Sequence, residues 1–338
     1  MDVDWLASGR NPTLIEFEDW AFPNALRPRD EDVAFDLDDV LSSVVSLRAE
    51  IPVDAFTADI LGTERGGNGV VINDTGLVLT IGYLITEAET IWLVANNGTA
   101  VPAHVVGYDQ VTGFGLVQAL GRLAVPAIGR GSANDIAVGD RAVVAGHGGR
   151  RHALHTEINS KHEFAGYWEY VLDEAIFTTP AHPLWGGAAL IGSDGRLLGI
   201  GSLLIQERLE DDTTVDNNMF VPINLIEPIL DDLMKFGKVD RPPRPWLGLF
   251  TTESHGHLVV AGLTKGAPAD EAGMQAGDVV VKVAETPVTD LVDLFRRIWA
   301  VGPAGSVIPL TIERDGGVLT VQVTSADRES FLKSPGLH

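Results

Sequence analysis

The sequence predicts a mainly β protein with at least two folded domains. From Gly66 onward, short apolar runs alternate with turn residues such as Asn97-Gly98 and Asp194-Gly195, and helical periodicity is absent from these runs. Many short strands separated by regular turns are typical of a barrel or sandwich. Residues 238–245 then form a Pro-rich stretch typical of a stiff, extended linker. We therefore expect the remainder, to about residue 325, to be a separate module.

Individual elements follow from the same patterns. The runs expected to form strands are 69–72, 77–80, 90–95, 103–107, 114–120, 141–145, 170–177 and 197–203. Apolar side chains at helical spacing predict a helix over 225–236. Residues 43–47 form either a short helix or the first strand.

Length and composition limit the class of protein. The chain has 338 residues, enough for two or three domains, and its 45% hydrophobic and 21% charged residues are ordinary for a soluble protein. No apolar run approaches the roughly 20 residues of a membrane-spanning helix. The acidic start lacks the features of a secretory signal. We expect a cytoplasmic location, or a periplasmic one if a signal has been removed.

Charge and cysteine content exclude further classes. A formal net charge of −23 argues against binding to nucleic acid or to anionic membrane surfaces. The absence of Cys excludes disulfides and thiol chemistry. The histidines His147, His152, His155 and His162 form a loose cluster whose spacing fits a zinc site only weakly. We therefore expect no metal and no cofactor.

The first 42 residues form an acidic, Pro-containing arm. A purely disordered tail would be poorer in aromatic residues than this arm, which carries Trp5, Phe17, Trp20, Phe22 and Phe35. Such side chains could anchor the arm on its own domain or on a neighbouring subunit, and the sequence does not distinguish the two.

Several segments between residues 69 and 223 match a known family in one collinear order. They are Gly-Val-Val-Ile at 69–72 with Gly-Leu-Val-Leu-Thr at 76–80, Val-Val-Gly-Tyr-Asp-Gln-Val-Thr at 105–112, Gly-Arg-Gly-Ser at 129–132, Val-Gly-Asp at 138–140, and Phe-Val-Pro-Ile at 220–223. The series resembles HtrA/DegP-type serine proteases. The resemblance implies a trypsin-like double β-barrel.

The C-terminal part resembles the PDZ domain of the same family. Trp246-Leu247-Gly248-Leu249 is similar to the family's carboxylate-binding loop, and residues 266–280 match the segment that follows it. The resemblance implies an α+β PDZ domain. The domains expected are an arm at 1–42, a trypsin-like domain at 43–237, a linker at 238–245, a PDZ domain at 246–326 and a tail at 327–338.

The resemblance also shows what the chain lacks. A trypsin-like site needs a base, a residue that orients the base, and a nucleophile. The family's His, Asp and Ser positions correspond here to Tyr83, Gly113 and Trp185. A Tyr is a poor base near pH 7, Gly has no side chain, and an indole cannot form an acyl-enzyme. All three roles are vacant, so we expect no catalytic residues.

The surrounding loop is altered too. The turn before Trp185 is two residues shorter than in the family and contains Pro183, which puts the oxyanion hole in doubt. Replacement catalysts are conceivable, and the candidates are His182, Ser132, Thr178, Thr179 and Asp109. We expect structural roles for His182 and Asp109. We expect Tyr83 and Trp185 to fill the cleft between the barrels, the alternative being an apolar floor for a ligand.

The resemblance implies peptide binding by the PDZ domain through strand addition. Backbone N–H groups of Leu247, Gly248 and Leu249 would meet a terminal carboxylate, and Arg244 would add positive potential. The residues expected at this site are Arg244, Trp246, Leu247, Gly248, Leu249, Leu291, Leu294 and Phe295. The same apolar residues would be core in any PDZ domain. We expect micromolar binding to peptides that end in an apolar residue.

Three hypotheses for function remain open. The first is a proteolytically inactive HtrA-like chain that binds protein C-termini through its PDZ domain as adaptor, sensor or assembly subunit. The second is an active endopeptidase with a rearranged site. The third is a subunit that joins mixed oligomers with an active homologue. The resemblance implies a homo-oligomer, a trimer in this family, as the alternative to mixed assembly.

Overall fold

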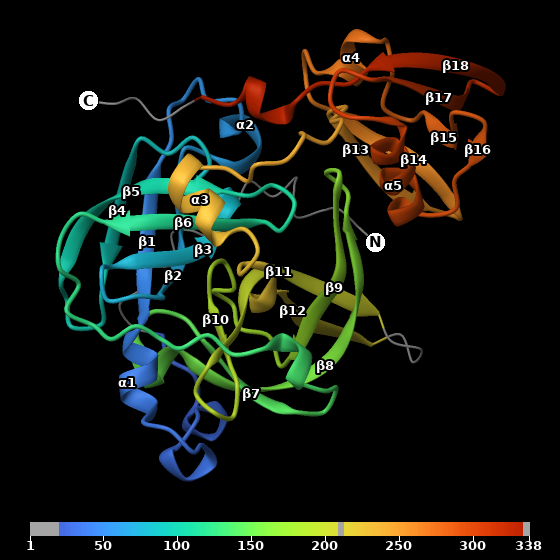
Figure 1. The fold of residues 1–338 in the computed structure, drawn as a ribbon. Helices are drawn as coiled ribbons and strands as arrows, with labels where there is room; N and C mark the ends of the chain where they lie inside the picture. The colour runs from blue at the N-terminus through green and yellow to red at the C-terminus, as the bar shows by residue number, and fades with distance from the viewer. Residues whose placement is uncertain (1–19, 209–212, 334–338) are drawn as a thin grey trace. The chain divides into compact units, whose positions relative to one another are not determined.

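The computed structural model describes residues 20–208 and 213–333, which divide into two compact units (Figure 1). We call the first the barrel unit, which runs to Lys161 and includes Ala175–Val239 and Lys333. The second, the C-terminal unit, comprises His162–Glu174 and Asp240–Leu332. Each unit is described separately below. Among the described residues, no helix combines the length and apolarity needed to cross a bilayer.

The first half of the barrel unit is a closed barrel with the strand order β1-β2-β3-β6-β5-β4. Its strands are β1 (Val44–Glu50), β2 (Glu64–Val71), β3 (Leu77–Ile81), β4 (Thr90–Val94), β5 (Ala100–Tyr108) and β6 (Phe114–Ala119), drawn in blue to teal in Figure 1. Residues 44–47 are therefore strand. The helix α1 (Leu37–Ser42) precedes them and begins at Asp36, whose carboxylate accepts from the Asp39 N–H.

The second half of the barrel unit is another closed barrel, with the order β10-β11-β12-β9-β8-β7. Its strands are β7 (Arg141–Ala145), β8 (Ala153–Gly166), β9 (Tyr170–Thr179), β10 (Ala189–Ile191), β11 (Leu197–Arg208) and β12 (Thr214–Pro222). Fully buried side chains such as Ile176, Leu190 and Phe220 form its core. The runs predicted from apolar patterning thus fold as strands of two barrels.

The helix expected over 225–236 is shorter in the structure. A short η7 (Ile223–Leu225) is separated from α3 (Leu230–Phe236) by a turn that contains Pro228. A proline disfavours helical conformation in the residue before it, which accounts for the break. The remaining short helices of this unit are η2 (Asn24–Leu26), η3 (Asp30–Asp32), α2 (Ala58–Leu61), η4 (Gly82–Leu84), η5 (Ala133–Asp135) and η6 (Gly149–His152).

The described part of the N-terminal arm packs on its own barrel unit. The Trp20 ring stacks on His152 with centroids 4.5 Å apart, and the Phe22 N–H donates to the Arg151 carbonyl at 3.0 Å. Arg150 pairs with Asp38. For residues 20–42 these contacts favour anchoring in cis, whereas Trp5 and Phe17 lie outside the described residues.

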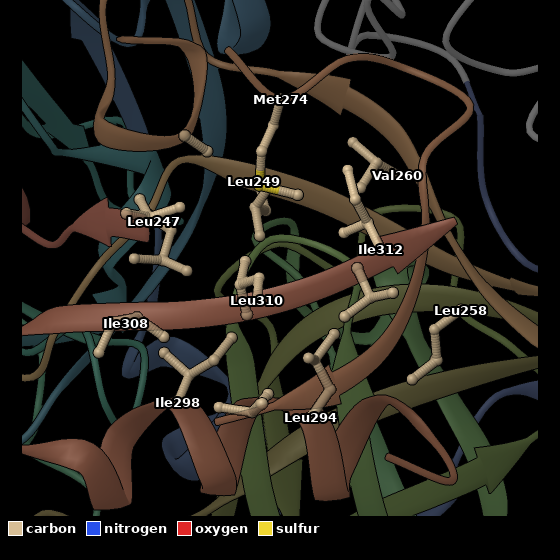
Figure 2. Close-up of a cluster of buried hydrophobic side chains, with 14 of the residues drawn as sticks. Leu247, Leu249, Leu258, Val260, Met274, Leu294, Ile298, Ile308, Leu310 and Ile312 are labelled. Carbon is tan, nitrogen blue, oxygen red and sulfur yellow. The ribbon is translucent and has the colours of Figure 1, made fainter. Parts of the chain in front are cut away.

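The C-terminal unit contains a twisted sheet in the order β13-β14-β15-β17-β18, so β13 is an edge strand. Its elements are β13 (Leu249–Ser254), β14 (His257–Leu263), α4 (Pro268–Glu271), β15 (Val279–Val283), β16 (Thr286–Pro287), α5 (Leu291–Val301), β17 (Val307–Arg314), β18 (Gly317–Thr324) and η8 (Arg328–Phe331). Figure 2 shows Leu294 and Ile298 of α5 pointing at Leu310 and its neighbours on the sheet.

A hairpin tip from the β8–β9 connection also belongs to the C-terminal unit. Residues 162–174 group with it rather than with the barrels, a feature absent from the domain division drawn from sequence. Val171 joins the buried apolar cluster of the unit. Arg296 of α5 pairs with Glu163 and, at 2.7 Å, with Asp173. The tip is thus fastened by apolar and ionic contacts.

Candidate functional site

The three degenerate triad positions come together in the barrel unit. Tyr83 lies on η4, Gly113 immediately precedes β6, and Trp185 lies in the loop before β10. The Gly82 N–H donates to the Gly113 carbonyl at 2.7 Å. The Tyr83 hydroxyl donates to the Ser202 carbonyl at 2.9 Å and forms a second hydrogen bond with the Trp185 side chain. The two aromatic side chains therefore contact each other, which favours a filled cleft.

The proton of Tyr83 is held firmly. Burial raises the pKa of the phenol well above its usual value, and the hydrogen bond with Trp185 lowers it only in part. Because the phenol donates to the Ser202 carbonyl, its proton is already in use. Tyr83 is consequently unsuited to the role of general base.

Asn68 of β2 clamps the loop that would carry a nucleophile. Its side-chain amide donates to the carbonyls of Leu184, at 2.9 Å, and Gly186, at 3.1 Å. Its backbone N–H also donates to the Gly186 carbonyl at 2.8 Å. Gly187 adopts φ of 74°, and a Cβ there would lie 1.8 Å from the Asn68 carbonyl oxygen. The loop before β10 is therefore packed against the first barrel, and position 187 has no room for a residue larger than Gly.

The oxyanion hole that the resemblance implies would lack one of its donors. In a trypsin-like site the oxyanion is held by the N–H of the nucleophile and by the N–H two residues before it. With Trp185 at the nucleophile position, the second position is Pro183, which has no N–H. The Leu184 N–H, between them, donates to His182 Nδ1 at 3.0 Å. The spacing of Pro183 from Trp185 is the sequence signal for this missing donor.

His182 has a structural role. Its Nδ1 accepts from Leu184, so Nε2 carries the proton and donates to the His152 carbonyl at 2.9 Å. The side chain is fully buried and lies against the rings of Trp20 and Phe22. Burial lowers its pKa to about 4. Both ring nitrogens are engaged with backbone, which leaves neither available to a substrate.

Asp109 and Ser132 also hold loops, whereas Thr178 and Thr179 lie at the end of β9. The Asp109 carboxylate accepts from the Thr112 N–H at 2.9 Å and so closes the turn before Gly113. The Ser132 hydroxyl accepts from the Asn134 N–H at the start of η5. Within residues 20–208 and 213–333, no three His, Asp or Glu side chains gather as metal ligands would. The histidine cluster is dispersed, with His155 facing Asp32 and His152 stacked on Trp20.

The C-terminal unit contains a carboxylate-binding loop, and a carboxylate occupies it. The Oε1 atom of Glu169 accepts from the backbone N–H groups of Leu247, Gly248 and Leu249 at 3.1, 2.7 and 3.0 Å. Its Oε2 accepts from Leu247 at 3.1 Å. Gly248 has φ of 77°, and a Cβ there would lie 2.4 Å from that of Ala267. The loop thus forms a backbone nest around Glu169.

The hairpin tip also pairs with the edge strand. The Thr251 N–H donates to the Tyr167 carbonyl at 2.9 Å, and the Tyr167 ring lies 6.0 Å from that of Phe250. Leu249 lies opposite Glu169, and Thr251 lies opposite Tyr167. The strand and the tip therefore run in opposite directions. This is the register in which an antiparallel ligand strand would lie along β13, with one backbone hydrogen bond formed. No sequence pattern noted above predicts this contact.

Two opposing effects act on the Glu169 carboxyl. Burial raises its pKa to about 7, whereas the amide hydrogen bonds and the charge of Arg328 on η8 lower it. Arg244, expected to supply positive potential here, has its guanidinium 4.3 Å above the Trp299 ring. The cation acting on the site is therefore Arg328, which lies in the segment expected to be a tail.

The apolar residues expected to line a peptide pocket lie in the core of the unit. Leu247, Leu249, Leu294 and Phe295 are fully or almost fully buried, and Leu291 is partly buried at the edge. Trp246 pairs by its backbone with Ala326 and packs against the ring of Phe331 at 5.1 Å. These side chains therefore support the loop from behind, while its backbone N–H groups form the contact surface.

Two closed barrels, and a six-stranded sheet covered by α5, define the class: a trypsin-like peptidase fold joined to a PDZ domain. Residues 67–200 match the family model of the trypsin-like peptidase domain, and residues 245–324 match that of the PDZ domain. Both matches, in this order, support the HtrA family of serine proteases as the family of this chain.

Relatives of the chain carry both domains in the same order. It is 26% identical over 274 residues to the serine endoprotease DegS of Salmonella typhimurium, covering 76% of each chain. It is 26% identical over 319 residues to the periplasmic pH-dependent serine endoprotease DegQ of Escherichia coli, covering 85% of this chain and 69% of DegQ. The structure of the HtrA-type protease AlgW with a tripeptide superposes on this chain with a TM-score of 0.51 at 18% sequence identity. The superposition covers 89% of this chain and 97% of the AlgW chain. At that identity the superposition shows the fold alone.

Proposed function

We propose that this HtrA-family chain has lost proteolytic activity and acts by binding protein C-termini through its PDZ domain, as adaptor, sensor or assembly subunit. One observation carries the first half of the proposal. Trp185 stands at the nucleophile position and forms a hydrogen bond with Tyr83, which stands at the position of the base. Gly113 and Pro183 remove the orienting carboxylate and one oxyanion donor.

The second half rests on the PDZ loop. Three consecutive backbone N–H groups converge on one carboxylate oxygen of Glu169. Charge-assisted hydrogen bonds of this kind are the means by which PDZ loops hold a peptide terminus. A loop with this geometry is suited to carboxylates from other chains.

The test of inactivity is a fluorophosphonate probe combined with casein digestion. We expect no labelled Ser or Thr and no digestion above buffer. Trp185→Ser restores a hydroxyl, yet we expect it to remain inactive because no base and only one oxyanion donor are present. Disabling a triad costs about 10⁶ in kcat, so an active HtrA protease run in parallel gives a clear contrast. A labelled Ser or Thr in the unaltered protein would establish the alternative, an endopeptidase with a rearranged site.

Assembly and compartment are proposed from the relatives. We propose that the chain forms a homo-oligomer, as HtrA proteins do, or a mixed oligomer with an active homologue. Size-exclusion chromatography with light scattering, alone and with such a homologue, separates the two. DegQ is named a periplasmic enzyme, which favours the second of the compartments expected from the sequence.

A further inference from the structure

We propose that the hairpin tip Tyr167–Glu169 is an internal ligand of the PDZ domain, held in its carboxylate-binding loop and competing there with the C-terminus of any external partner. The proposal deepens the peptide-binding function proposed above and rests on it. It assigns a built-in competitor to the loop.

The first step is the chemistry of the loop. All three N–H groups expected to hold a terminal carboxylate are taken by Glu169, at 2.7 to 3.1 Å. A carboxyl group of the chain's own therefore stands where a partner's terminus would bind. The two cannot occupy the nest together, because like charges at this separation repel and the donors are saturated.

The second step is the register. A peptide that adds to β13 with its terminal residue opposite Leu249 places the residue two positions earlier opposite Thr251. In the tip, Glu169 and Tyr167 hold these two places. The Tyr167 ring lies near Phe250, with the centroids 6.0 Å apart. A partner that uses the same register would therefore have to displace both Glu169 and Tyr167.

The third step is how an internal segment imitates a terminus. Glu169 has φ of 63°, a left-handed conformation that is uncommon for a residue with a side chain. This conformation turns the backbone back into β9 while the side chain continues toward the loop. The carboxylate then arrives without a chain end. Trp168, between the two anchors, packs on Tyr167 and Tyr170 instead of on β13.

The fourth step is competition. A ligand attached to its own receptor acts at an effective concentration in the millimolar range when its tether allows contact. External peptides bind only the fraction of molecules whose tip has left the loop, so their apparent affinity is reduced by that fraction. Weakening the tip should therefore strengthen binding of a partner. A purely structural Glu169 would show the opposite or no effect.

The experiment measures fluorescence anisotropy of a labelled peptide, Phe-Ala-Gly-Tyr-Trp-Val with a free carboxylate, against the full chain. The variant Glu169→Ala removes the acceptor that holds the tip in the loop. The control variant, Glu174→Ala, removes an exposed carboxylate from the same hairpin. The control peptide is the same sequence with a C-terminal amide. Thermal unfolding verifies that each variant is folded.

We expect Glu169→Ala to bind the peptide about tenfold or more tightly than the unaltered chain, as release of a mostly docked competitor requires. Glu174→Ala should not change affinity, and the amide should not bind. Equal, measurable affinity of the unaltered chain and Glu169→Ala would overturn the internal ligand while leaving peptide binding intact.

A second measurement decides the case in which no variant binds peptide. Hydrogen exchange of the Leu247, Gly248 and Leu249 amides should be faster in Glu169→Ala than in the unaltered chain, because these N–H groups lose their acceptor. Unchanged exchange would show that the tip does not occupy the loop. Faster exchange without peptide binding would instead retain the internal ligand and remove the proposed receptor function.

Discussion

The protease-like cleft and the PDZ loop are both filled by the chain itself, but in different ways. In the cleft, Tyr83 and Trp185 replace the groups that would do chemistry, and their hydrogen bond joins the two positions. In the loop, every receptor group is retained, and Glu169 saturates it. In the proposed function, the cleft has lost its chemistry through substitution, whereas the loop keeps its chemistry behind a segment that competes with external partners.

The difference shows how to tell a lost site from a masked one. At a lost site, the groups that would meet a ligand are absent, as the N–H of Pro183 and the side chain at Gly113 are absent here. At a masked site, the groups are present and paired with an imitation of the ligand. The fact that a site is filled therefore does not distinguish a lost site from a masked one. The chemical identity of the group that fills it does.

The largest effect that we predict concerns the packing of the cleft. Gly187→Ala should destabilise the barrel unit by about 4 kcal/mol or more, since a Cβ would lie 1.8 Å from the Asn68 carbonyl oxygen. Gly98 has a similar φ of 83° with open space around it, so Gly98→Ala should cost only about 1 kcal/mol. Chemical denaturation measures both. Equal losses would mean that the loop before β10 yields, and that the cleft is less closed than the contacts indicate.

The next prediction concerns acid. The pKa of His182 is about 4 in the folded chain, below the ordinary value of about 6.5, so the unfolded state binds the proton more tightly. The contribution of the neutral His182 to the free energy of unfolding is complete above about pH 6.5. It should decrease as the pH falls toward about 4, by at most about 1.4 kcal/mol per pH unit. Glu and Asp residues add slopes of their own. The measurement is the difference in slope between the unaltered chain and His182→Gln, and identical slopes would contradict the assignment.

The smallest predicted effect is the pH dependence of Glu169 docking in the carboxylate-binding loop. Its sign is opposite to that of His182, because docking weakens as the pH rises. The docked Glu169 has a pKa of about 7, above the ordinary value of about 4.3, so docking is strongest below pH 4.3. Docking should weaken, less than tenfold per unit, as the pH rises to about 7. Arg328 favours the charged form, and Arg296 on α5 is already paired with Glu163 and Asp173. Carbon-detected NMR of the Glu169 carboxyl follows this titration, and a midpoint near 4 would contradict it.

The sequence predicted the architecture well because its signals are local. Apolar runs and turns gave the strands, and the family motifs gave two barrels and a PDZ domain. The assignment of Tyr83, Gly113 and Trp185 to the triad positions rests on the motif beside each and stays a prediction. The helix predicted over 225–236 is longer than the observed one, because apolar spacing does not include the restriction that Pro228 imposes.

The docking of the tip was not predictable in the same way. Glu169 lies about 80 residues from its partners, and its sequence neighbours Tyr167, Trp168 and Tyr170 fit an ordinary hairpin end. The available signal was an aromatic-rich tip with one acid at its centre, which is unusual for a solvated turn. Arg328 was missed because the residues after 326 were considered a tail. Glu169 and Arg328 both act on residues that are distant in sequence and become neighbours only in the folded chain.

The tether between Tyr167–Glu169 and its loop has a consequence for dose response. Competition within one molecule has a fixed stoichiometry, so dilution or overexpression of the protein leaves the masked fraction unchanged. Occupancy by a partner is then set by the partner's own concentration relative to a built-in threshold. A chain of this kind would ignore termini that are scarce and respond once they accumulate, and substitutions in the tip would move the threshold without altering the receptor.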